Sequence, residues 1–146
     1  MNINSLDRFI EAQKQIYEIA LKEMKNGKKQ THWMWYVFPQ LRGLGKSNIS
    51  YIYGINGIDE AKEYLSHPLL SKRLVEISIA MLEHKGKAAH EILGNIDCMK
   101  LHSSMTLFAY ISEQDSVFHQ VLDCFYNKEL DEQTLKLINK EKSTLD

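Results

Sequence analysis

Apolar residues recur at helical spacing along most of this chain. Between residues 6 and 26 they form one continuous stripe, with Ser5 as a candidate N-cap and Gly27 at the expected end. The members of the stripe are Leu6, Phe9, Ile10, Ile16, Tyr17, Ala20, Leu21 and Met24. The pattern therefore predicts a long first helix with one face buried.

A second helix is predicted from Pro68 to about Leu82, because proline suits a first helical position. Apolar residues surround most of its circumference, which favours a central, deeply buried helix. Shorter helices are predicted over residues 47–53, 59–65, 88–93, 97–111 (capped by Asp97), 116–125 (capped by Ser116 or Asp115) and from 131, ending in a frayed tail over 139–146. No run alternates with period two, so we predict an all-α, compact multihelical single domain with buried central helices.

Composition narrows the classes of partner. The 146 residues carry 18 Lys and Arg against 19 Asp and Glu, a net charge of −1. Extended nucleic acid or an anionic membrane would need a stronger positive field, so neither is expected as a partner. No apolar run is long enough to span a bilayer and no signal peptide is recognisable, which predicts a cytoplasmic protein. The spacing of Cys98 and Cys124 indicates neither a zinc site nor a needed disulfide.

The segment HWMWYVFPQLRGLGKS, residues 32–47, ends in a glycine-rich basic turn. A phosphate-binding P-loop requires G-x-x-x-x-G-K-[ST], but Gln40 occupies the place of the first glycine. An NTPase is therefore disfavoured. Arg42, Lys46 and Ser47 could still form an anion-binding nest, with equal weight given to an ordinary turn whose cations are solvated.

Most aromatic rings of this segment recur at helical spacing, which is typical of core packing. The alternative is a ligand pocket, because Trp33 and Trp35 lie close in sequence to His32, to the Gln40 amide and to two cations. A planar base stacked on a ring, with its phosphate in the basic turn, would use such a set of residues.

The segment DCMKLHSSMTLF, residues 97–108, carries a second polar group. Asp97, Lys100 and Ser104 fall on one helical face, and Ser103 lies three residues after Lys100. A lysine beside a serine can activate a nucleophile. The favoured interpretation is structural, with Asp97 capping the helix and pairing with Lys100 while the hydroxyls bond back to their own helix. The histidines show no metal-ligand spacing, and His32 is the best candidate for a functional histidine because of its neighbours.

Five blocks of the chain, spanning roughly residues 5–139, resemble the DUF1810 family. They are HWMWYVFPQLRGLG, Tyr53 to Ile55, AKEYLSHPLL with Arg73 and Leu74, DCMKLHSSMTLF, and Phe125 and Tyr126 with Asp131, Thr134 and Leu135. The resemblance implies a compact multihelical single domain, and the family name records that the function is unknown. By position, the polar motif residues that it implies are His32, Gln40, Ser47, His67, Asp97, Lys100, Ser103, Ser104 and Thr106.

The layout of residues 61–101 is also loosely similar to NADAR domains, small helical proteins associated with ADP-ribose derivatives. We therefore expect the two polar segments to form one pocket for an anionic nucleotide-like or ADP-ribose-like ligand. The expected ligand-binding residues are His32, Trp33, Trp35, Gln40, Arg42, Lys46, Ser47, Asp97, Lys100, Ser103 and Ser104. Arg42 and Lys46 would hold the phosphate. No cofactor or metal is expected.

Two alternatives stay open at this point. The first is a hydrolase of an N- or O-glycosidic or ADP-ribosyl bond, with Asp97, His32, Lys100 and Ser104 as candidate catalytic residues. The second is a protein–protein interaction domain without a small-molecule site. Polar residues scattered over different faces would favour the interaction domain, whereas capture and turnover of a ligand would use the same residues.

Overall fold

The computed structural model describes residues 5–145, and within this range every regular element is an α-helix. The helices are α1 (Asp7–Lys25), α2 (Met34–Val37), α3 (Asn48–Ile52), α4 (Gly57–Ser66), α5 (Pro68–Leu82), α6 (Ala89–Leu93), α7 (Asn95–Tyr110), α8 (Val117–Phe125) and α9 (Glu132–Leu145). A single parallel bridge joins Leu41 to Ile55. The predicted all-α, single-domain fold is confirmed.

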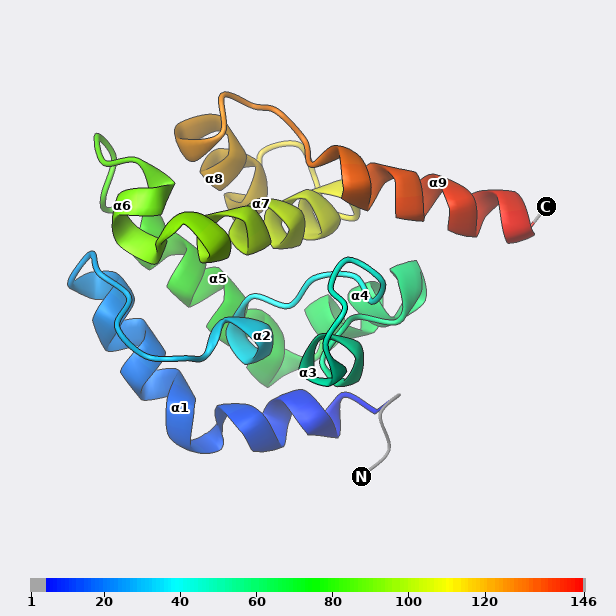
Figure 1. Cartoon of the computed structure of the whole chain (residues 1–146), viewed down its shortest axis with the longest axis horizontal. Coiled ribbons are helices and arrows are strands. Elements are labelled where there is room, and N and C mark those ends of the chain that lie inside the picture. Colours follow the sequence, from blue (N-terminus) through cyan, green and yellow to red (C-terminus); the bar gives the residue numbers. More distant parts are fainter. Residues whose placement is uncertain (1–4, 146) are drawn as a thin grey trace.

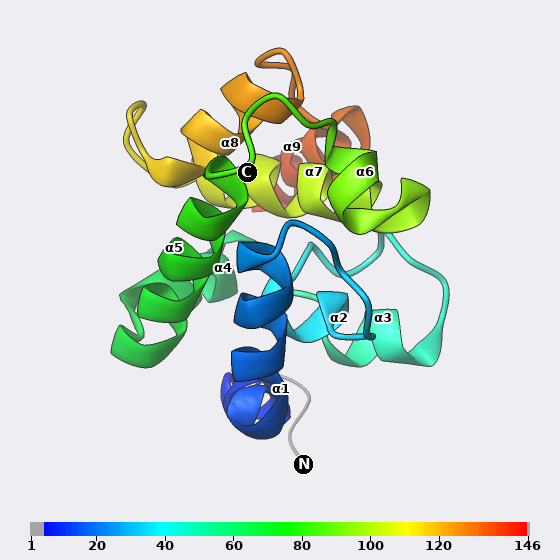
Figure 2. The same cartoon turned by 90° about the vertical axis from the view of Figure 1, so that its left-hand side faces the viewer.

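The helices form two layers (Figure 1). Helices α1 to α4 make up the lower layer, α6 to α9 make up the upper layer, and α5 crosses between them (Figure 2). Accordingly, α5 contacts both α1 and α8, and α7 contacts α6, α8 and α9. The core is continuous, because buried apolar side chains of both layers belong to one cluster. In the described part of the chain, no helix has the length and apolar character needed to cross a membrane.

Helix ends follow local sequence signals in most places. Helix α5 begins at Pro68, and the Leu69 N–H donates to His67 Nδ1 at 3.2 Å. Ser116 caps α8 through a hydrogen bond from the His119 N–H. Asp131 caps α9 in the same manner, because its carboxylate accepts from the Thr134 N–H at 3.1 Å. Those three predictions are confirmed.

The predicted start of α7 is wrong. Gly94, with φ of 88°, ends α6 and precedes α7, so the helix begins at Asn95 and Asp97 lies inside its first turn. Helix α7, not α5, has the longest buried run, from Ser103 to Ala109. Helix α5 instead exposes Ile79, which is 48% accessible. At the other end of the chain, α9 continues through the segment for which we predicted a frayed tail, and residue 146 lies outside the described residues.

The loop between α2 and α4 is fixed from two sides. Its two arms meet at the bridge, where the Ile55 N–H donates to the Gln40 carbonyl at 2.8 Å and the Arg42 N–H donates to the Ile55 carbonyl. From below, the buried Arg8 guanidinium of α1 donates to the carbonyls of Ile52 and Gly54. This loop carries Gln40 and the glycine-rich turn, so the two attachments determine where those residues lie.

Candidate functional site

The two polar sequence segments meet at a pocket of about 330 Å³. One wall comes from α2 and the loop after it, the opposite wall from the first half of α7, and the remaining side from the start of α9. The lining residues are Trp35, Gln40, Leu44, Gly45, Ile96, Met99, Lys100, His102, Ser103, Asp131 and Gln133. We refer to it as the Gln40 pocket.

A cation–π contact joins the two walls. The Lys100 ammonium lies 4.0 Å from the centroid of the Trp35 ring. Behind it, the Asp97 carboxylate bonds to Lys100 at 3.2 Å and to Lys29 at 2.8 Å. The Lys29 side chain is only 7% exposed, and its ammonium also lies above the Trp33 ring. Asp97 therefore anchors Lys100 beside the pocket.

The charge state of Asp97 follows from these neighbours. Partial burial raises the pKa of its carboxyl, but the hydrogen bonds and positive charges of Lys29 and Lys100 outweigh that effect, so the pKa lies below its usual range. Asp97 is thus ionised at neutral pH. A carboxylate with both oxygens bound to lysines is suited to positioning a cation, and Asp97 does not itself line the pocket.

Gln40 is the most informative residue of the pocket. It is 7% exposed as a whole residue and lines the cavity, and its side-chain amide makes no hydrogen bond to the described part of the chain. Among the described residues, the buried side-chain polar atom without a partner is Ser104 Oγ, so the polar atoms of the Gln40 amide are open to the cavity. Its backbone carbonyl accepts the hydrogen bond from the Ile55 N–H, which fixes the position of the residue beside the cavity. The donors and acceptor of this amide are therefore free to bind a molecule that enters the cavity.

The side of the pocket near α9 is rigid. The His102 ring stacks on Tyr126 at a centroid distance of 4.3 Å, and its Nε2 lies 2.8 Å from the Glu129 carbonyl oxygen. Because a carbonyl oxygen only accepts, Nε2 carries a hydrogen, and Nδ1 of the neutral ring is left as an acceptor. Nearby, the Ser103 hydroxyl donates to the Asp131 carboxylate at 3.0 Å. These groups form a polar margin to an otherwise apolar cavity.

Several predicted site residues lie elsewhere. Trp33 is fully buried, and its indole N–H donates to Glu23 at 2.8 Å, so it is a core residue and not a stacking surface. His32 is exposed and does not line the pocket. Arg42 packs on the Tyr51 ring at 4.5 Å and lines a different cavity with Leu137 and Glu141.

Three further predicted residues also lie outside the pocket lining. Lys46 is exposed, and Ser47 caps α3 by accepting a hydrogen bond from the Ser50 N–H. Ser104 is fully buried in α7, and its hydroxyl has no hydrogen-bond partner. Within the predicted set, the structure therefore brings Trp35, Gln40, Lys100 and Ser103 together at one cavity, with Asp97 behind Lys100.

The glycine-rich turn has a packing explanation. A Cβ at Gly45 would lie 2.6 Å from the Ser50 Cβ and 3.5 Å from the Trp35 ring, so only glycine lets the loop lie against both. Gly43 has φ of 108°, a region that side chains disfavour. The two glycines thus shape one wall of the pocket, without the arrangement that a P-loop requires.

Sequence reasoning missed His102, Asp131, Gln133 and Lys29. Asp131 was recognised only as a helix cap, and its added bond to Ser103 depends on how α9 packs beside α7. Lys29 lies 68 positions before its partner Asp97, so no local spacing signals the pair. His102 lies in the second polar segment, residues 97–108, and its position three residues after Met99 on α7 was an available signal. Among the described residues, no group of three or more His, Cys, Asp or Glu side chains could hold a metal ion.

Comparison with known proteins gives two matches. Over 94% of its length the chain resembles the crystal structure of the conserved hypothetical protein Rv1873 from Mycobacterium tuberculosis, with 40% identity, a TM-score of 0.91 and 99% of that protein covered. No curated protein matches the chain. The model of a family described as a protein of unknown function, DUF1810, matches residues 3–138. Because this match covers nearly the whole chain, and the predicted blocks lie within it, the protein belongs to the DUF1810 family.

Proposed function

We propose that this protein binds a small nucleotide-like ligand in the Gln40 pocket. The observation that carries the proposal is the Gln40 amide, which lines the cavity, is open to it and makes no hydrogen bond within the described chain. A glutamine amide presents one donor and one acceptor side by side, and that pair matches the edge of a nucleobase such as adenine.

The other lining residues are compatible with this ligand class. Leu44, Ile96 and Met99 provide apolar surface for a flat ring, and Lys100 provides a positive charge for a phosphate. Since Lys100 covers one face of Trp35, we expect the base to contact the indole edge and the apolar side chains instead of stacking on that face. The phosphate contact is thereby assigned to Lys100, in place of Arg42.

The volume of the Gln40 pocket favours the smaller nucleotide-like ligands. Ligand pockets in proteins usually measure about 300–1,000 Å³. At about 330 Å³ the Gln40 pocket fits a mononucleotide, whereas ADP-ribose would extend beyond its mouth. Turnover of the ligand has weaker support than capture, because Ser104 is sealed in the core and both oxygens of Asp97 are paired.

One observation favours a second candidate, a surface for a protein partner. Ile96 and Met99 are 72% and 68% exposed at the rim of the pocket, and large apolar side chains exposed together often mark an interface. A nucleotide site predicts that a nucleotide stabilises the folded protein, whereas a surface for a protein partner does not. One experiment therefore separates the two candidates.

The experiment measures the melting temperature with AMP, GMP, NAD and ADP-ribose. A ligand that binds only the folded state raises it, because stability increases by RT ln(1 + [L]/Kd). We expect a saturable rise with at least one mononucleotide, its loss in Lys100→Gln, and its retention in Lys46→Gln, which changes an exposed lysine outside the pocket lining. Mass spectrometry of the recovered ligand distinguishes capture, which leaves it intact, from hydrolysis. No rise with any member of the panel would reject the nucleotide proposal and leave the partner surface.

A further inference from the structure

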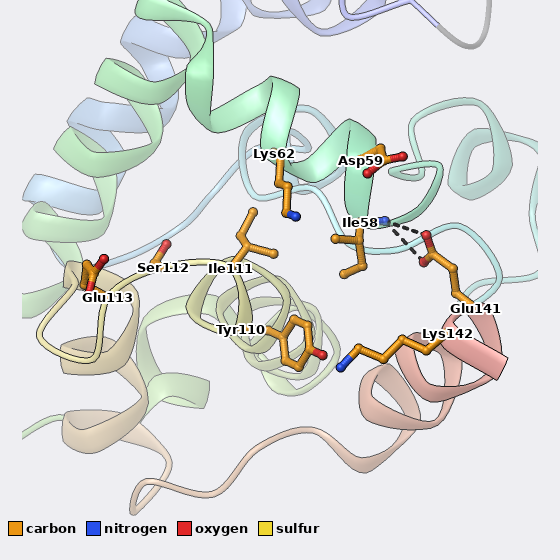
Figure 3. Close-up of a pocket in the computed structure, with 9 residues that line it drawn as sticks. All are labelled: Ile58, Asp59, Lys62, Tyr110, Ile111, Ser112, Glu113, Glu141 and Lys142. Carbon is orange, nitrogen blue, oxygen red and sulfur yellow. Dashed lines mark hydrogen bonds between the residues drawn. The ribbon is translucent and has the colours of Figure 1, made fainter. Parts of the chain in front are cut away.

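A larger cavity, of about 580 Å³, lies at the opposite end of α7 from the Gln40 pocket. It is enclosed by α4, by the end of α7 with the turn that follows, and by α9 (Figure 3). It shares no lining residue with the Gln40 pocket. Any ligand that it takes is therefore additional to the proposed function.

The middle of this cavity is apolar and aromatic. Ile58 of α4 and Ile111 after α7 point toward one another, with the Tyr110 ring beside them (Figure 3). Tyr110 is 39% exposed, which is high for a large aromatic ring. A flat apolar group inserted here would remove this surface from water, and that burial is favourable.

Two lysines extend into the same space. The Lys62 ammonium lies near the two isoleucines, and the Lys142 ammonium lies 4.8 Å from the centroid of the Tyr110 ring (Figure 3). Neither forms a salt bridge with a carboxylate among the described residues. Both charges therefore remain available to a bound anion.

The three carboxylates of the lining lie away from the two ammonium groups. Glu141 is committed to the start of α4, where the Ile58 N–H donates to both of its oxygens at 3.1 and 3.2 Å. Asp59 and Glu113 lie at opposite margins of the cavity in Figure 3. The lining as a whole carries three carboxylates and two lysines, but the Lys62 and Lys142 ammonium groups lie closest to the apolar middle of the cavity (Figure 3).

We propose that this cavity is a second ligand site, which takes a small organic anion with a flat apolar ring. The ring contacts Ile58, Ile111 and Tyr110, and the acidic group pairs with Lys62 and Lys142. Lysine side chains are long and flexible, so both can reach one carboxylate or phosphate without moving the helices.

The test is a titration of the ¹⁵N-labelled protein with indole-3-acetate and, separately, with phenyl phosphate, followed by NMR. We expect saturable shifts at the amides of Ile58, Ile111 and Lys142. Lys62→Gln and Lys142→Gln should each weaken binding about tenfold, the loss expected for one charge-assisted contact, while Lys28→Gln, which changes an exposed lysine elsewhere, should not.

Three results of this titration would contradict the proposed second ligand site. Absence of saturable shifts with both probes, shifts confined to residues of the Gln40 pocket, or wild-type affinity in both lysine variants would each overturn the proposal. AMP titrated in the same way reports on the Gln40 pocket, through shifts at Gln40 and Lys100. The two sites can thus succeed or fail independently.

Discussion

Two ion-pair clusters connect distant parts of this chain, and they differ in access to solvent. In the first, Arg8 of α1 pairs with Glu60 of α4 at 2.6 Å, and both side chains are almost fully buried. In the second, Asp97 of α7 joins Lys29 and Lys100, and Lys100 borders an open pocket. Carboxylate–cation pairs therefore occur both in the buried interior and beside an open pocket.

The Arg8 cluster is saturated. The guanidinium donates to the carbonyls of Ser5, Ile52 and Gly54 as well as to both oxygens of Glu60. Glu60 additionally accepts from the Asn56 N–H at 2.9 Å. With its bonds directed to the protein and no solvent access, this cluster holds the loop in place and has nothing left for a ligand.

The Asp97 cluster is unsaturated on one side. Lys100 has a single ion-pair bond, its side chain is 21% exposed, and the unpartnered Gln40 amide lines the same cavity. What separates the structural pair from the functional candidate is therefore unused hydrogen-bonding capacity next to a cavity. The presence of charge alone does not separate them.

The largest expected effect comes from breaking the closed cluster. Arg8→Leu leaves Glu60 buried without its cation, and removal of one partner of a buried pair costs about 3–5 kcal/mol. Urea unfolding at pH 7 measures the loss. The exposed pair Lys14 and Glu11 provides the control, because both side chains are more than half exposed. Lys14→Leu should change the free energy of unfolding by less than about 1 kcal/mol, and equal losses in the two variants would contradict the comparison.

A smaller loss of stability is expected for a substitution in the glycine-rich turn, which forms one wall of the Gln40 pocket. Gly45→Ala places a Cβ 2.6 Å from the Ser50 Cβ, and overpacking of this kind costs about 1–3 kcal/mol. The double variant Gly45→Ala with Ser50→Gly should recover most of the loss, because the clash is with the Ser50 side chain. If the alanine variant unfolds at the wild-type urea concentration, the packing explanation of the glycine-rich turn is wrong.

Glu23 is a third carboxylate held by hydrogen bonds, and its contribution can be tested by measuring stability against pH. Burial raises the pKa of Glu23, but hydrogen bonds from Gln30, Thr31 and Trp33 outweigh it and lower the pKa from 4.5 to about 2. A carboxyl with a lowered pKa stabilises the fold above its unfolded pKa, and this contribution is lost as the pH falls toward the folded value. Glu23→Gln should therefore be less stable than wild type at pH 7, and the difference should shrink between pH 5 and pH 2.

Urea unfolding of both proteins at pH 7, 4 and 2.5 checks this expectation. Asp97→Asn is the counterpart in the open cluster and should shift the pH dependence in the same direction, because the pKa of Asp97 is also lowered. A constant difference between wild type and Glu23→Gln over the whole range would show that Glu23 does not contribute through its charge.

The sequence predicted what depends on neighbours along the chain. Pro68, Ser116 and Asp131 mark helix starts because caps and proline act within a few residues. Pairings across the fold were not predictable in this way. Arg8 and Glu60 are 52 positions apart, and nothing in the sequence marks this arginine as a buried one.

Only part of the candidate site could be predicted from the sequence. Trp35, Gln40, Lys100 and Ser103 were expected and line one pocket, because each polar segment has several polar residues that the fold brings together. The sequence did not indicate which of Trp33 and Trp35 lines the pocket. The Trp33 indole N–H donates to Glu23 of α1, and this bond holds the Trp33 ring in the core. Likewise, His102 and not His32 lines the cavity, because α7 supplies its wall while residue 32 lies before α2.

The smallest effect on stability, and the most direct test of the account, is expected for Gln40→Met. The Gln40 amide makes no hydrogen bond within the described chain and is open to the cavity, so its replacement by an apolar side chain of similar shape should change stability little. If the Gln40 amide binds the ligand, the variant should melt close to the wild-type temperature while losing the rise caused by the mononucleotide. Gln15→Met, at an exposed position of α1, should retain that rise. A destabilised Gln40→Met protein with an undiminished ligand-induced rise would contradict the account.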